Sequence, residues 1–85
     1  MVYFSHTIQD ALGIHARPSG LISREANKYE SDIAIVKGDK RADAKKVFTL
    51  MSLGAKKGDT IQIEIFGKDE EIAGKAFKEL IEAQL

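Results

Sequence analysis

The chain of 85 residues contains no cysteine, no tryptophan and only one proline. Without cysteine there are no disulfides, no thiolate metal sites and no cysteine nucleophile. A fold of this size must therefore rely on the packing of its core for stability. An excess of charge is also absent, because 13 basic side chains balance 13 acidic ones. No overall field attracts nucleic acid or anionic lipid, and electrostatic recognition has to come from a local patch.

Long apolar runs are missing as well. Residues 1–7 alternate and become polar too early to contain the apolar stretch of a signal peptide. No run approaches the length that a membrane-spanning helix requires. These features predict a cytoplasmic protein without direct membrane insertion, built as one domain over residues 1–85.

Hydrophobic periodicity indicates four strands and three helices. Strands show apolar side chains at every second position, most clearly in Thr60-Ile61-Gln62-Ile63-Glu64-Ile65. The first helix has Pro18 in its first turn, where a missing N–H costs nothing. Gly38-Asp39 is typical of a turn that joins two strands as a hairpin. The expected strands are 2–8, 32–37, 40–44 and 60–65, and the expected helices are 16–28, 47–53 and 72–81.

The order of these elements is βαββαβα. Four strands can pair as an antiparallel sheet, so we predict an α+β fold, an open-faced β-sandwich with three helices on one face of a four-stranded sheet. The stripe of the closing helix is expected to consist of Ile72, Ala73, Ala76, Phe77, Leu80 and Ile81.

The most informative segment is Gly13-Ile14-His15-Ala16-Arg17-Pro18. It places a histidine immediately before the N-terminus of a predicted helix, where backbone N–H groups lack partners. Such a terminus binds anions: the amides of Ala16 and Arg17 can point at a phosphate, and the Arg17 guanidinium can pair with its oxygens. A neutral imidazole nitrogen is nucleophilic, so His15 is predicted to take up and pass on a phosphoryl group. The alternative at this point is a loop histidine without a chemical role.

Together with this segment, Met51-Ser52-Leu53-Gly54 and the length of 85 residues resemble the HPr family, the histidine-containing phosphocarriers of the phosphoenolpyruvate-dependent sugar phosphotransferase system. The resemblance extends over the whole chain. It implies that His15 accepts a phosphoryl group from phosphorylated enzyme I through Nδ1 and donates it to enzyme IIA domains. It further implies that Arg17 steadies this group, that Ala16 contributes its amide, and that the protein is a covalent carrier without a cofactor and not a stand-alone enzyme.

One position departs from the family pattern. Many relatives carry a regulatory serine at the start of the short second helix, and the aligned position here is Lys46. Lysine has no hydroxyl to accept a phosphate ester, which argues against modification by the dedicated HPr kinase. Thr49 and Ser52 lie within two turns, and they are the alternative sites for a second phosphate. Both hydroxyls are expected to bond back to a preceding carbonyl within the helix.

Residues 47–53 are apolar nearly all round, and a helix of about two turns cannot bury every face. By the match to the family, Val47, Phe48 and Met51 form an exposed partner-binding patch, and Leu50 and Leu53 belong to the core. Periodicity alone is equally compatible with all five side chains in the core.

The remaining polar residues give weaker signals. His6 lies on the apolar face of the first strand, so packing or an edge position is expected. His6 and His15 lack a carboxylate or thiolate at metal-ligand spacing, and no metal site is predicted. The lysines are interrupted by acidic residues and accompanied by few aromatics, which argues against nucleic-acid binding. We expect a monomer.

Two other functions stay open at this level. A regulatory relative in a nitrogen-related phosphorelay would keep the fold and His15 and use the phosphate as a signal. A small α+β nucleic-acid or protein-binding module would contain the histidine only incidentally.

Overall fold

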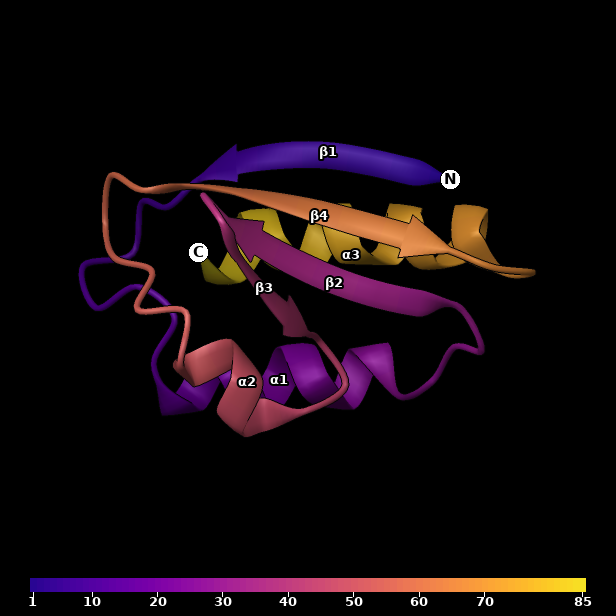
Figure 1. The fold of residues 1–85 in the computed structure, drawn as a ribbon, viewed down its shortest axis with the longest axis horizontal. Helices are drawn as coiled ribbons and strands as arrows, with labels where there is room; N and C mark the ends of the chain where they lie inside the picture. The colour runs from indigo at the N-terminus through magenta and orange to yellow at the C-terminus, as the bar shows by residue number, and fades with distance from the viewer.

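The computed structural model describes all residues from 1 to 85. Figure 1 shows a four-stranded sheet with helix α3 behind it and helices α1 and α2 together below it. This arrangement confirms the predicted α+β open-faced sandwich and the order of its elements. None of the helices is both long and apolar enough to cross a membrane. The elements are β1 (Val2–Thr7), α1 (Ala16–Ala26), β2 (Asp32–Lys37), β3 (Lys40–Asp43), α2 (Val47–Met51), β4 (Thr60–Phe66) and α3 (Glu70–Gln84).

The strands are all antiparallel and lie in the order β1-β4-β2-β3. In the central strand β4, Ile63 pairs with Phe4 of β1 on one side and with Ile35 of β2 on the other. Successive side chains of a strand point to opposite faces, so the alternation in β4 buries Ile61, Ile63 and Ile65 against the helices. The predicted alternation is confirmed.

The predicted hairpin is also present. Lys37 of β2 pairs with Lys40 of β3, and only Gly38 and Asp39 lie between them. Gly38 has a φ of 61°, a left-handed conformation that glycine adopts without a steric cost.

An apolar core of 18 buried residues fills the space between the sheet and the helices. Helix α3 contributes Ala73, Phe77 and Ile81, which are spaced four residues apart on its inner side. Ile72 does not belong to this stripe as expected, because its side chain is 70% exposed. With about 3.6 residues per turn, the two neighbours of Ala73 lie on different sides of the helix: Gly74 is buried and Ile72 is on the outer side.

Helix α1 ends at Ala26, two residues before the predicted end at Lys28. The side-chain amide of Asn27 donates to the Ser23 carbonyl at 2.8 Å and to the Lys45 carbonyl at 3.1 Å. Asn27 therefore joins the end of α1 to the segment before α2, and the chain leaves the helix there.

Helix α2 covers 47–51 and not the predicted 47–53. The N–H of Leu53 bonds to the carbonyl of Leu50 at 3.2 Å, which is the tighter spacing of a 3₁₀ turn. Gly54 follows with a φ of 65°, so the chain turns away from the helix direction.

Asp69 ties the start of α3 to the segment before β2. Its carboxylate accepts hydrogen bonds from the Ser31 hydroxyl and from the backbone N–H groups of Glu30 and Ser31, the latter two at 3.0 Å. The hydrogen bond from the Ser31 hydroxyl has the largest effect, and together with the backbone hydrogen bonds it holds the pKa of Asp69 below its usual range. The stability that these hydrogen bonds contribute is therefore fully present above the ordinary pKa of an aspartate. It is lost as the pH falls through the lowered pKa of Asp69.

Candidate functional site

The loop between β1 and α1 fixes the position of His15. The N–H of Ile14 donates to the Ala55 carbonyl at 3.0 Å, and the Ile14 side chain is buried. Gly13 has a φ of 67°, and a Cβ at this position would lie 2.2 Å from the Ala55 carbonyl oxygen. Only glycine fits both this approach and this backbone conformation. The loop is consequently pressed against Ala55 just before it reaches His15.

His15 is the N-cap residue of α1 and has an extended backbone, as predicted from its place before the helix. Its carbonyl accepts the first helical hydrogen bond, from the N–H of Ser19 at 3.0 Å. The imidazole makes no capping bond, and its side chain is 34% exposed. Its Nε2 lies 3.7 Å from Oδ2 of Asp10, so a carboxylate is close to this ring nitrogen.

The first turn of α1 offers free donors next to His15. The backbone N–H groups of Ala16 and Arg17 have no acceptor within the chain. Pro18, the third helical residue, is buried and has no N–H to leave unpaired. The Arg17 side chain is exposed. The predicted residues His15, Ala16 and Arg17 thus adjoin one helix N-terminus, an arrangement suited to an anion.

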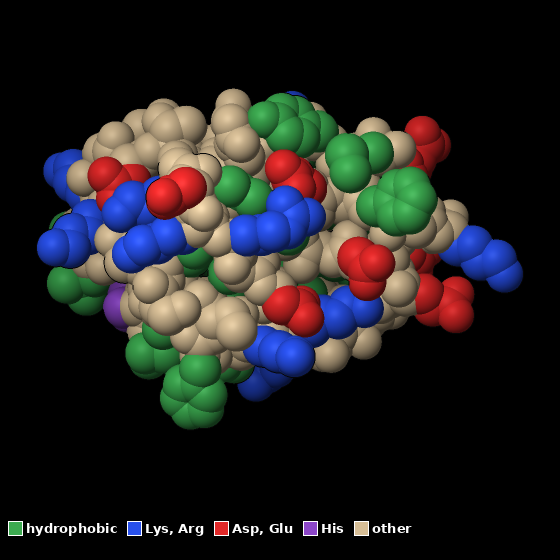
Figure 2. Space-filling view, in the orientation of Figure 1, with side chains coloured by type: hydrophobic (Ala, Val, Ile, Leu, Met, Phe, Trp, Pro, Cys, Tyr) green, Lys and Arg blue, Asp and Glu red, His purple; other side chains and the backbone are tan.

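Helix α2 presents part of its apolar surface to solvent. Phe48 is 84% exposed and Met51 is 39% exposed, whereas Leu50 and Leu53 are fully buried. Val47 is half-buried. Figure 2 shows apolar side chains protruding at the lower edge of the molecule, over α2. The exposure of Phe48 and Met51 and the burial of Leu50 and Leu53 are as predicted, whereas Val47 is less exposed than expected. We call Val47, Phe48 and Met51 the α2 patch.

The segment just before α2 is hydrogen-bonded to α1. The hydroxyl of Ser23 in α1 donates to the Lys45 carbonyl at 2.9 Å, beside the bond from Asn27. Figure 1 shows the two helices together below the sheet. The exposed α2 patch therefore lies beside α1, the helix that begins after His15.

Lys46 is the N-cap residue of α2, and it is exposed and makes no capping bond. The Thr49 hydroxyl donates to the carbonyls of Asp43 and Lys46 at 2.7 and 2.8 Å. The Ser52 hydroxyl donates to the Thr49 carbonyl at 2.8 Å. Both hydroxyls are thus bonded back to preceding carbonyls, as predicted.

Asp10 and Leu12, in the loop between β1 and α1, have no role predicted from the sequence. Oδ2 of Asp10 accepts the N–H of Leu12 at 3.0 Å, and this local turn leaves the Leu12 side chain 70% exposed. Aspartate commonly bonds to the amide two residues further on, and that preference is the signal that was available. The proximity of Asp10 to His15 depends on how the loop closes, and no spacing rule indicates it.

His6 lies on the edge strand β1 and on its half-buried side, as expected. Its Nε2 is buried without a hydrogen-bond partner. No group of three His, Asp or Glu side chains is placed to hold a metal ion.

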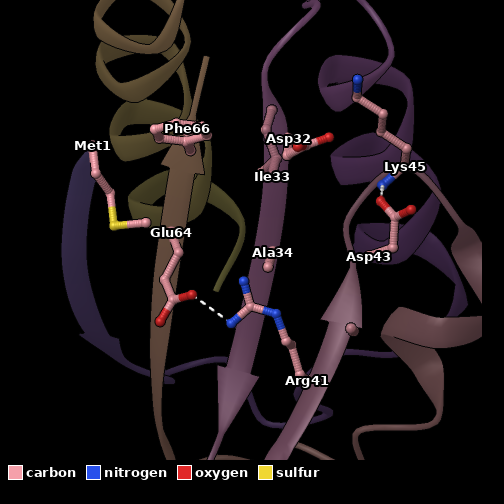
Figure 3. A pocket seen from close by; sticks show the side chains of 10 residues that line it. Met1, Asp32, Ile33, Ala34, Arg41, Asp43, Lys45, Glu64 and Phe66 are labelled. Atoms are coloured by element: carbon pink, nitrogen blue, oxygen red, sulfur yellow. Dashed lines mark hydrogen bonds and ion pairs between the residues drawn. The ribbon is translucent and has the colours of Figure 1, made fainter.

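The open face of the sheet contains a hollow of about 410 Å³. Figure 3 shows Arg41 of β3 reaching across Ala34 to pair with Glu64 of β4, with Phe66 at one end of the hollow. None of the predicted site residues lines it. On the face in Figure 2, basic and acidic side chains are interspersed, and they form no continuous field of one sign.

Comparisons with known proteins agree with the geometry. The family model for the PTS HPr component phosphorylation site matches residues 2–83. The chain is 42% identical over 76 residues to the phosphocarrier protein HPr of Mycoplasma pneumoniae, covering 88% of this chain and 86% of that protein. It is 40% identical over 72 residues to the HPr-like protein Crh of Halalkalibacterium halodurans, covering 85% and 86%.

A solved structure gives the same assignment. HPr from Thermoanaerobacter tengcongensis matches with a TM-score of 0.91 at 37% identity, covering 98% of this chain and 93% of that one. The HPr proteins among these relatives are phosphocarriers, which carry a phosphoryl group and are not enzymes. The chain therefore belongs to the HPr family, the phosphocarrier proteins of the phosphotransferase system.

Proposed function

We propose that His15 is the residue that carries the phosphoryl group, and that it takes this group from phosphorylated enzyme I and passes it to enzyme IIA domains in sugar uptake. The observation that supports this most strongly is the position of the imidazole at the N-cap of α1, with the Asp10 carboxylate near Nε2 and two unpaired amides at the start of the helix.

The proposed step is a direct transfer. The lone pair of Nδ1 attacks phosphorus while the bond from phosphorus to the donor breaks and its electrons stay with the donor. The phosphoryl oxygens then lie at the helix N-terminus, within reach of the Ala16 and Arg17 amides and the Arg17 guanidinium. A helix terminus stabilises an anion by about 0.3–1 kcal/mol, and by ~2 when partly buried. That is enough to steady the group and still allow onward transfer.

The direct test is incubation with enzyme I and phosphoenolpyruvate, followed by mass spectrometry of the intact chain. We expect one acid-labile phosphate, located on His15 by fragmentation, and its transfer to an added enzyme IIA domain. A parallel arm uses the enzyme I of a nitrogen-related system. Faster phosphorylation in that arm, or phosphate that stays on the chain when IIA is added, would favour a regulatory relative over a sugar carrier.

Arg17→Ala is expected to slow transfer in one or both directions without unfolding the protein, because the side chain is exposed. A hydrogen bond to a charged group contributes about 1.5–3 kcal/mol, which corresponds to roughly tenfold or more in rate. Rapid-quench kinetics of both half-reactions measure the effect. Arg24→Ala in the last turn of the same helix is the matched control. Equal rates for the two variants would remove Arg17 from the site.

Phe48→Ala is expected to weaken binding to enzyme I by about 1–2 kcal/mol, as for an aromatic side chain in a contact surface. Stability should change little, since the ring is exposed. Calorimetric titration and thermal unfolding measure the two quantities. Phe66→Ala is the control, because this ring is also exposed but lies on β4. If Phe66→Ala lowers the affinity as much as Phe48→Ala, the α2 patch is not the docking surface.

Lys46→Ser is expected to make the protein a substrate for HPr kinase and ATP, whereas the parent chain remains unmodified. The substitution adds a hydroxyl at an exposed N-cap position, and the nearby hydroxyls of Thr49 and Ser52 are already engaged. Acid-stable phosphate is measured on both proteins and on Lys57→Ser, which adds a hydroxyl in an exposed turn. Stoichiometric phosphate on the parent chain would overturn this expectation and direct attention to Thr49 or Ser52.

A further inference from the structure

Asp10 is held in one conformation by three hydrogen bonds within the chain. Its N–H donates to the Leu85 carbonyl at 2.9 Å, and its own carbonyl accepts the N–H of Gly13 at 3.1 Å. Its carboxylate oxygen Oδ2 accepts the N–H of Leu12 at 3.0 Å. Backbone and side chain are therefore both fixed, and the negative charge of Asp10 has a defined position.

That position is beside one nitrogen of His15. Oδ2 of Asp10 lies 3.7 Å from Nε2, and the carboxylate takes part in no other ion pair. The separation is longer than a hydrogen bond, so the contact is electrostatic. The charge of the Asp10 carboxylate acts mainly on His15, because salt screens the interaction between exposed charges that lie further apart.

A negative charge next to Nε2 has a chemical consequence for Nδ1. A neutral imidazole carries its proton on only one nitrogen, and a neighbouring acceptor selects which one. A carboxylate beside Nε2 favours the tautomer protonated at Nε2, which leaves the lone pair on Nδ1. We propose that Asp10 is a positioning residue, which keeps the proton of His15 on Nε2 and directs the phosphoryl group to Nδ1.

The same contact assists the uptake of the phosphoryl group, and this part of the inference rests on the proposed function. When Nδ1 forms its bond to phosphorus, the proton stays on Nε2 and the ring becomes positively charged, at 3.7 Å from the carboxylate. When the group leaves, the bond between Nδ1 and phosphorus breaks and its electrons return to Nδ1. The leaving group is then a neutral imidazole rather than an imidazolate, because Nε2 has kept its proton.

The test is a measurement of the tautomer in the absence of any partner. In ¹⁵N-labelled protein at a pH where His15 is neutral, two-bond ¹H–¹⁵N correlations give the ratio of the Nε2–H form to the Nδ1–H form. Asp10→Asn preserves an acceptor for the Leu12 N–H and removes the charge. We expect this ratio to fall by about twofold to fivefold, the range that partly exposed ion pairs support. Asp39→Asn, which removes a carboxylate from the hairpin between β2 and β3, should leave it unchanged.

A second readout concerns the transfer itself. The rate at which the chain accepts a phosphoryl group from enzyme I should fall by a similar factor in Asp10→Asn, with no such fall in Asp39→Asn. An unchanged tautomer ratio in Asp10→Asn overturns the role of Asp10, whether or not phosphate is transferred. A changed ratio in a chain that enzyme I does not phosphorylate supports the role of Asp10 and refutes the proposed function instead.

Discussion

His15→Ala is expected to abolish acid-labile phosphorylation by enzyme I while the fold persists. The imidazole carries the attacking nitrogen in the proposed transfer, and alanine offers no substitute. Folding should not depend on this side chain, because it is 34% exposed and makes no capping bond to α1. The helical bond from Ser19 uses the carbonyl of residue 15, which alanine retains.

Phosphate incorporation and the urea unfolding midpoint measure these two expectations on the same samples. His6→Ala is the matched control, since it removes the other histidine, which lies on β1. This control should remain fully phosphorylated. If His15→Ala were phosphorylated by enzyme I at the parent rate, His15 would not be the carrier residue.

Gly13→Ala is expected to give the largest loss of stability among the variants considered, about 2–4 kcal/mol. A methyl group would meet the Ala55 carbonyl oxygen at 2.2 Å and the Lys56 Cα at 2.7 Å, and both are backbone atoms that cannot move aside alone. The φ of 67° adds the strain of a left-handed conformation. Because the Ile14 bond to Ala55 lies next to it, the same change should displace His15 and slow phosphorylation.

Gly38→Ala separates the two contributions. Gly38 has a similar φ of 61°, but nothing lies within 4 Å of an added Cβ, so only the conformational strain of about 1–2 kcal/mol applies. Urea unfolding of both variants gives the difference directly. Equal losses would mean that the contact with Ala55 relaxes without cost and that the loop is not held there.

Local patterns in the sequence predicted the elements well, since each rests on a few neighbouring residues. The strand over Thr60 to Ile65 and the turn at Gly38 are determined by neighbouring residues alone, and both occur as expected. The ends of the helices were harder to predict from the sequence. Helix α1 ends where Asn27 reaches the carbonyl of Lys45, a partner 18 residues away that periodicity does not reveal.

The candidate site likewise has some features that neighbouring residues determine and others that depend on contacts between distant segments. The position of His15, Ala16 and Arg17 at a helix N-terminus follows from adjacent residues and the helix signal. The point at which the buried side of a helix begins does not, and the prediction that Ile72, near the start of α3, belongs to the buried stripe was wrong. The order of the strands and the approach of Asp10 to His15 depend on contacts between segments, and the sequence contains no local signal for either.

A main-chain oxygen of Leu85 accepts the N–H groups of both Gln9 and Asp10, so the loop before His15 is joined to the last turn of α3. The N–H of Leu85 in turn donates to the Ile81 carbonyl at 2.9 Å. Opening of that turn releases the two loop amides together, and in hydrogen exchange they should lose protection in the same event as the amide of Leu85. The loop before His15 and the C-terminal turn of α3 are therefore expected to open as one cooperative unit, although Asp10 and Leu85 are 75 positions apart in the sequence.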